Sequence, residues 1–111
     1  MFVRCAFFKG RVVPGQEEAF HSYVEERMMP LWAAFPGALE VRVLREVETD
    51  SASTPLPLVM TMRFPTRQAI EAALASDIRA QSRKAAKDLL AMFEGEVVHT
   101  VFALDELVAA G

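Results

Sequence analysis

The last strand-like stretch of the chain reads Gly95-Glu96-Val97-Val98-His99-Thr100-Val101-Phe102. Its length and β-branched content are typical of a buried strand, yet it places the imidazole of His99 among valines. Such a ring is either a hydrogen-bonded core residue or the polar end of a ligand pocket. The rest of the chain bears on this choice, because the position of the strand in a sheet determines what His99 faces.

Upstream of this stretch, the spacing of apolar residues alternates between strand and helix periods. Apolar residues three and four apart from Phe20 to Phe35 predict a first helix, which Pro30 should kink or break near Met29. The expected elements are strands over 2–9, 39–47 and 58–64, the first helix from 16 to 35, a loop over 49–55, a short helix over 67–74, and another from Ser76 or Asp77 to about Met92.

The resulting order, β-α-β-β-α-β, predicts an α+β domain of the ferredoxin-like class, with a four-stranded antiparallel sheet and helices on one face. The first and third strands should be central, and the last strand should lie beside the first. We expect one domain over 1–111, with a core over about 1–104 and a tail over 105–111. The other sheet face is apolar, so two sheets facing each other in a dimeric α+β barrel would cover it.

Alternation along the strands divides their side chains between the two faces. We expect the purely apolar side of each strand to face the helices, and Cys5 to lie on that side. The opposite side then combines a few polar groups with apolar ones, as small-molecule sites usually do. Its polar members would be Arg4, Arg42, Thr61, Arg63 and His99, and its apolar members Phe2, Ala6, Phe8, Leu44, Val59, Val97 and Val101.

The composition excludes several classes of partner. The chain has 12 basic and 15 acidic residues and a net charge of −3, so no basic field favours a nucleic acid. Its apolar runs are too short to span a membrane. A single cysteine excludes an internal disulfide, and no signal-like segment is evident, which favours the cytoplasm. A hydrophobic content of 52% is high for a small domain and favours a homodimer.

His99 is the candidate general acid or base, because its ordinary pKa lies near neutral pH. The alternative is a neutral histidine that only holds a backbone or hydroxyl partner. Tyr23, on the flank of the first helix, is a second catalytic candidate whose phenol would donate to a ligand oxyanion, unless its ring simply packs. Trp32 would line the mouth of the cleft or the dimer seam, or act in packing alone.

Arginines dominate the candidate ligand-binding groups. Inward-pointing Arg42 and Arg63 suggest a ligand that bears a carboxylate, phenolate or enolate. The alternative is that they pair with Glu40 and Glu46 across neighbouring strands or across the dimer, because buried charges are usually paired. The candidate substrate-binding residues are Arg4, Arg42, Thr61, Arg63 and Trp32.

Motifs for cofactors and metals are missing. The chain has no glycine-rich phosphate loop, dinucleotide fingerprint, Cys-x-x-Cys or His-Glu-x-x-His. Its two histidines are far apart in sequence, which disfavours a multi-histidine metal site. We therefore expect no metal and no cofactor, with a haem held by a single histidine as the alternative.

Four segments together resemble a known family in their order and spacing. They are residues 14–23 (Pro-Gly-Gln-Glu-Glu-Ala-Phe-His-Ser-Tyr), Met29-Pro30-Leu31, Phe35-Pro36-Gly37-Ala38 and Ala73-Leu74-Ala75-Ser76. This pattern, which covers nearly the whole chain, resembles the EthD-like branch of the dimeric α+β barrel proteins and its REDY-like members from pigment and antibiotic pathways.

The resemblance implies a homodimer with a small-molecule cleft between sheet and helices in each protomer. It also implies chemistry such as cofactor-free oxygenation, isomerisation or cyclisation of polyketide, aromatic or pigment intermediates. One departure matters: Met28 stands where EthD-like helices often carry a histidine. Two functions therefore stay open, namely a cofactor-independent enzyme and a non-catalytic small-molecule-binding or accessory dimer.

Overall fold

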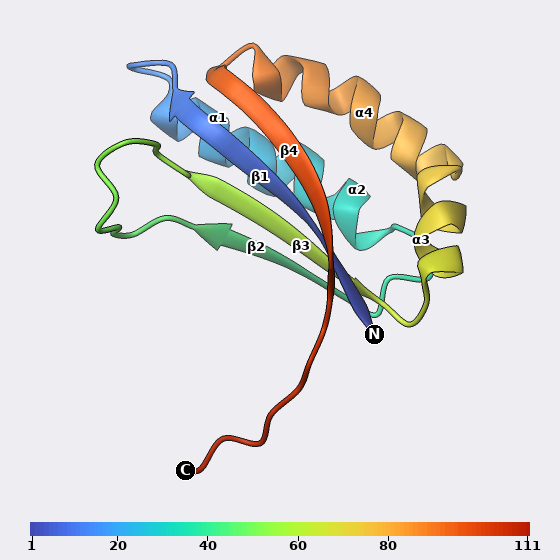
Figure 1. Cartoon of the computed structure of the whole chain (residues 1–111). Helices are drawn as coiled ribbons and strands as arrows, with labels where there is room; N and C mark the ends of the chain where they lie inside the picture. The colour runs from blue at the N-terminus through green and yellow to red at the C-terminus, as the bar shows by residue number, and fades with distance from the viewer.

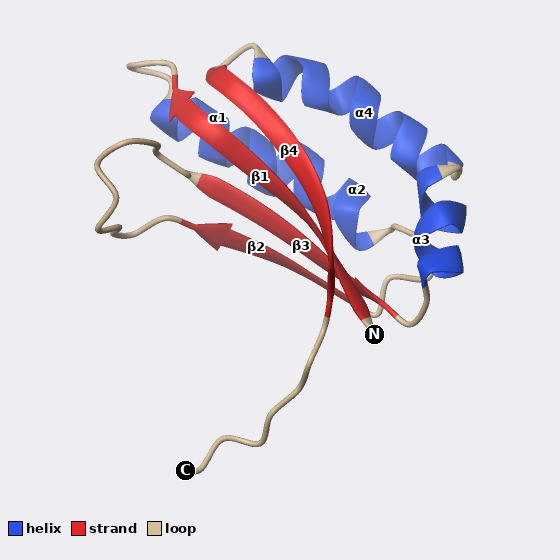
Figure 2. Cartoon of the chain, viewed as in Figure 1, coloured by secondary structure: helices blue, strands red, loops and turns tan.

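The computed structural model describes residues 1–111 as a four-stranded antiparallel sheet with its helices gathered on one face (Figures 1 and 2). This confirms the predicted fold class. The elements are β1 (Phe2–Val12), α1 (Glu17–Tyr23), the π-helical segment η1 (Val24–Met28), α2 (Met29–Ala33), β2 (Glu40–Arg45), β3 (Leu58–Phe64), α3 (Arg67–Leu74), α4 (Asp77–Leu90) and β4 (Phe93–Ala103).

The strands run in the order β2-β3-β1-β4. β1 and β3 are therefore central, and β4 pairs with β1 along its whole length, as the sequence predicted. After Ala103 the chain has no regular secondary structure and leaves the body of the domain (Figure 1). None of the helices has the length and apolar character needed to cross a membrane.

The predicted disruption of the first helix takes the form of a π-helical turn. η1 ends at Met28, and Pro30 lies in the first turn of α2. Since proline has no N–H group to donate, the carbonyls of the preceding turn lose a regular partner, and the backbone widens locally. Phe20, Val24, Met28 and Trp32 are all buried, so the apolar stripe continues across the turn.

β4 begins at Phe93, two residues before the stretch that the sequence predicts as strand, so Gly95 lies inside the strand and not at its start. It sits directly opposite Gly10 of β1, and both residues have a positive φ. A Cβ on Gly95 would come within 2.1 Å of the carbonyl oxygen of Lys9. Only glycine permits this close approach of β1 and β4.

Aromatic packing identifies the helix-facing side of the sheet. The ring of Phe8 meets those of Phe20 and Phe93 edge to face, with centroid distances of 6.2 and 5.7 Å. Because Phe8 belongs to the same side of β1 as Arg4 and Ala6, all three face the helices. Directly opposite residues of paired strands share a face, so the pairing of Ala6 with His99 puts His99 there too.

This arrangement overturns the predicted division of side chains between the faces. Arg4 and His99 lie under the helices, not on the open face, whereas Cys5 lies on the open face beside Thr61 and Thr100. The alternation along each strand was correct, but alternation does not say which side meets the helices. The register supplies that information, because Arg4 pairs with Met62 of the apolar side of β3.

The open face of the sheet carries exposed apolar side chains. Leu44 and Phe102 are 51% and 46% exposed there. Phe7 packs its ring edge to face on Phe102, with centroids 6.2 Å apart. No helix of this protomer covers these groups (Figure 1).

Candidate functional site

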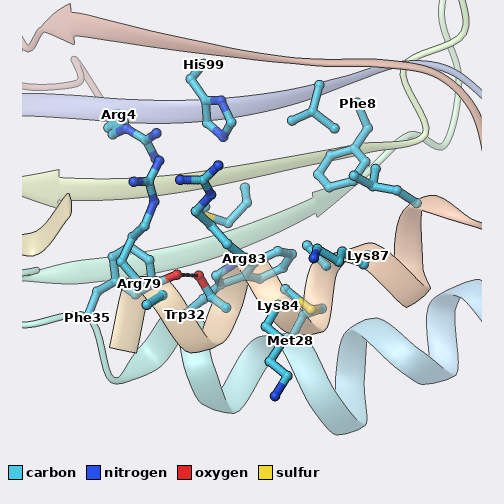
Figure 3. A pocket seen from close by; sticks show the side chains of 16 residues that line it. Arg4, Phe8, Met28, Trp32, Phe35, Arg79, Arg83, Lys84, Lys87 and His99 are labelled. Carbon is cyan, nitrogen blue, oxygen red and sulfur yellow. Dashed lines mark hydrogen bonds between the residues drawn. The ribbon is translucent and has the colours of Figure 1, made fainter. Parts of the chain in front are cut away.

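A cleft of about 900 Å³ opens between α4 and the helix-facing side of the sheet (Figure 3). α4 forms its helical wall and contacts α2 and η1 as well as β4. Its apolar lining comes from the strands β1, β3 and β4, from η1, α2 and α4, and from Phe35. It consists of Phe8, Met28, Trp32, Phe35, Met60, Ala80, Ala86, Leu90 and Val97.

Positive charge dominates the polar part of this cleft. β1 contributes Arg4, and α4 contributes Arg79, Arg83, Lys84 and Lys87. No aspartate or glutamate lines the cleft. Figure 3 shows the guanidinium groups of Arg4, Arg79 and Arg83 and the ring of His99 converging on the space between sheet and helix. The arrangement can therefore hold an anionic group next to an imidazole.

Arg4 is the most enclosed of these cations, with 8% of its surface exposed. It takes part in none of the ion pairs, and the side-chain hydrogen bonds of arginines involve Arg11, Arg45, Arg63 and Arg79 only. Burial, and secondarily the charge of Arg79, lowers the pKa of the Arg4 guanidinium. The protein thus holds a buried cation without a counterion.

His99 reaches the cleft from β4. Burial lowers the pKa of its imidazole, and the charges of Arg4 and Arg79 lower it further. A ring with a pKa below its ordinary value is neutral at pH 7 and can accept a proton. No hydrogen bond joins it to another residue lining the cleft (Figure 3), so its ring nitrogens are available to a ligand.

The basic residues of α4 that line the cleft were not among the site residues predicted from the sequence. Arg79, Arg83 and Ala86 follow one another at spacings of four and three, which places them on one side of the helix. Ser76 caps α4 by accepting from the N–H of Arg79 at 3.2 Å. The spacing was visible in the sequence, but nothing in it showed that α4 stands away from the sheet.

Tyr23 does not reach the cleft. Its hydroxyl donates to the carbonyl oxygen of Ala85 at 2.7 Å, which ties the first helix to α4. The phenol therefore helps to hold the helical wall of the cleft in place. Its predicted contact with a ligand oxyanion is not found in this geometry.

Arg42, Arg63 and Thr61 lie on the open face of the sheet, so the predicted cavity shared by His99 and Arg63 is wrong. The Nε atom of Arg42 lies 2.6 Å from Glu40, and Arg63 lies 3.7 Å from the same carboxylate. This matches the alternative expectation of pairing with Glu40. The predicted partner Glu46 instead accepts from the N–H of Leu56 at 3.2 Å.

Trp32 and Met28 are both buried, and both line the cleft. Trp32 thus combines the packing role and the cleft-lining role that the sequence left as alternatives. At Met28, where the resembled family often has a histidine, the cleft is therefore lined by an apolar side chain. No three His, Cys, Asp or Glu side chains cluster as a metal site would require.

A comparison with family models found one match, to the antibiotic biosynthesis monooxygenase model, over residues 1–87. A search of curated proteins gave no significant match. Among solved structures, an EthD-family protein of Bacillus halodurans superposes with a TM-score of 0.70 at 17% identity, covering 95% of this chain and 100% of the other.

Two further structures have the same fold. SnoaB of Streptomyces nogalater, described as a cofactor-independent oxygenase, has a TM-score of 0.63 at 21% identity and covers 96% of both chains. A dimeric ferredoxin-like protein of Thermobifida fusca has a TM-score of 0.62 at 18% identity, covering 93% of this chain and 90% of the other. These similarities confirm the predicted resemblance to ferredoxin-like α+β barrel proteins.

The charge of Arg4 should be visible in the titration of His99. We predict that His99 titrates below its ordinary pKa of about 6.5 and that Arg4→Met raises this pKa, because removing a nearby cation stabilises the imidazolium form. The ring Cε1–H shifts, followed by NMR as a function of pH, report the value directly. His21 provides an internal control: burial and then Arg45 lower its pKa, and it should not respond. An unchanged His99 pKa in the variant would refute this coupling.

Proposed function

The chain belongs to the antibiotic biosynthesis monooxygenase family, and on that premise we propose that it is a cofactor-independent oxygenase of hydrophobic, oxygen-rich aromatic or polyketide molecules. The observation that carries this proposal is the cleft in front of His99. The imidazole of His99, whose pKa is lowered, faces a mostly apolar cleft there. Several cationic side chains and no carboxylate line this cleft. Such a site favours a substrate that becomes an anion during the reaction.

The first step is removal of a proton by His99. A neutral imidazole accepts a proton from a carbon next to a carbonyl group, or from a phenol, of the bound molecule. The negative charge spreads onto the substrate oxygens. Arg4 and Arg79 line the same cleft as His99 and point toward it (Figure 3), so they can stabilise that charge. The apolar lining strengthens this stabilisation because it excludes water.

The second step is attack of the electron-rich anion on molecular oxygen. The substrate carbon is oxidised, a C–O bond forms, and the peroxide takes the proton back from the His99 imidazolium. Loss of water then breaks the O–O bond and leaves a carbonyl group. One CH₂ group and one O₂ molecule thus give one carbonyl group and one water, so neither an external reductant nor a bound cofactor is required. The description of SnoaB as cofactor-independent supports this chemistry.

A non-catalytic small-molecule-binding protein is the second candidate, and Met28 favours it. This residue lies in the cleft and offers no group that can move a proton. The cleft would then bind the same kind of molecule without turnover. The two candidates differ in oxygen uptake and not in ligand affinity, so one set of variants separates them.

We further propose that the open sheet face is covered by the same face of a second copy. Leu44 and Phe102 are half exposed there, and a symmetric contact between two such faces would bury both. The dimeric relative from Thermobifida fusca supports this assembly. In the resulting dimer the clefts lie on the outer, helical sides, so each protomer has a complete cleft of its own.

Replacing His99 should abolish oxygenation while leaving ligand binding intact. With anthrone as the probe, after EDTA treatment and desalting, we expect His99→Gln to lower kcat/KM for oxygen uptake by about 100-fold or more, the usual contribution of a general base. Fluorescence of Trp32, the single tryptophan of the chain, would report unchanged probe binding.

The other histidine of the chain offers a matched control. His21→Gln lies outside the cleft and should retain wild-type turnover. Wild-type turnover in His99→Gln would refute the proposed role of His99. Probe binding without oxygen uptake in the wild-type protein would favour the non-catalytic candidate, and activity lost on EDTA treatment would contradict cofactor independence.

Substitutions at two consecutive residues of β4, which have nearly equal exposure but lie on opposite faces of the sheet, can test the dimer. Phe102 on the open face and Val101 on the helical side are 46% and 47% exposed. Phe102→Asp should shift the native mass from dimer to monomer at micromolar concentration, because it buries a charge in the interface. Val101→Asp should remain dimeric. A monomeric wild-type protein would contradict the assembly.

A further inference from the structure

The unpaired Arg4 is the strongest unexplained feature of the cleft. A buried charge is costly unless a partner of opposite sign and hydrogen bonds compensate it. Arg4 has neither within the chain, yet it belongs to a central strand that fixes its position. Its guanidinium points into the cleft (Figure 3), so a bound molecule is the available partner.

The neighbours of Arg4 strengthen this need for an anion. Arg79 lines the same cleft from α4, and its charge adds to burial, the larger cause, in lowering the pKa of the Arg4 guanidinium. Arg79 donates to the carbonyl oxygen of Leu74 at 3.4 Å, a contact that leaves its charge uncompensated. An anion between these two side chains would offset the repulsion, supply the acceptors that Arg4 lacks, and give Arg79 the counterion that a neutral carbonyl does not provide.

The two paired arginines of the open face provide a comparison within the same chain. Arg42 and Arg63 are more exposed than Arg4, and both still share the carboxylate of Glu40. The protein thus gives a carboxylate partner to two more exposed arginines and leaves the enclosed one without a partner. This contrast indicates that the missing partner of Arg4 comes from a ligand.

We propose that the substrate carries a permanent carboxylate on an aromatic body, with the carboxylate held between Arg4 and Arg79 next to His99. The proposal rests on the function assigned above and names its substrate class. A guanidinium presents two parallel N–H donors that match the two oxygens of a carboxylate. The aromatic body would lie against Trp32, Phe35 and Met28, which line the same cleft.

This arrangement gives the reaction its orientation. A carboxylate fixed at Arg4 would hold the reacting carbon of the same molecule at a set position relative to His99. Fixing two reacting groups in this way lowers the entropic part of the barrier. The carboxylate is a binding group only and takes part in no bond making or breaking.

The test measures binding and requires no turnover. Isothermal titration calorimetry would compare 2-naphthoate, its neutral analogue 2-naphthamide, and inorganic phosphate. We expect naphthoate to bind at least tenfold more tightly than naphthamide. Arg4→Met should weaken naphthoate binding by about tenfold to hundredfold, the usual effect of losing a charged hydrogen-bond partner, and should leave naphthamide binding within about twofold.

Two further variants complete the design. Arg67→Met, on α3 and outside the cleft, should bind all three probes as the wild-type protein does. Methionine fills the volume of the arginine stem, and circular dichroism checks that Arg4→Met is folded. If it is not, Arg79→Met supplies the same comparison from the helical side of the cleft, where the side chain is only partly buried.

The outcomes separate this inference from the proposed function. Equal affinity for naphthoate and naphthamide, or an Arg4→Met variant with wild-type affinity for naphthoate, would overturn the inference. Phosphate binding as tightly as naphthoate with the same dependence on Arg4 would also overturn it, because the site would then take a bare anion. If the wild-type protein takes up oxygen with a neutral anthrone, the oxygenase proposal stands even when one of these binding results overturns the inference.

Discussion

The antiparallel register of β1 against β4 is the constraint on which the site depends. By pairing Ala6 with His99 and Arg4 with Val101, it sets the imidazole and the guanidinium on the same face of adjacent strands, under the helices. The glycine pair at positions 10 and 95 permits the close approach that this register requires. A slip by one residue would turn His99 toward the open face and separate it from Arg4.

The position of α4 turns this pair of side chains into a site. The hydroxyl of Tyr23 bonds to Ala85 of α4, and α4 also contacts α2 and η1. The cleft lies between α4 and the sheet, and Arg79 and Arg83 reach into it from the helix (Figure 3). The arginines of the two sheet faces thus differ in their surroundings. Arg42 and Arg63 share the carboxylate of Glu40 on the open face, whereas Arg4, Arg79 and Arg83 line a cleft without any carboxylate.

The sequence predicted the element order, the central strands and the break before Pro30, because periodicity, turn residues and proline act locally. It also named His99 and Arg4 among the candidate site residues, and both line the cleft. It placed them on the wrong face, since alternation along one strand does not reveal the register with the next. Arg79 was missed because its spacing on α4 is that of an ordinary solvated face, and only the position of α4 over the cleft brings this side chain into the lining. Arg42 and Arg63 were expected to face the ligand because the same register was unknown.

The central claim is that the cleft in front of His99, and not the open face with its arginines, is where the protein binds its ligand. A crystal structure of the complex with 2-naphthoate tests this claim most directly. The account predicts the carboxylate between Arg4 and Arg79, with the rings against Trp32. Density for the ligand beside Arg42 and Arg63 on the open face, with an empty cleft, would contradict it.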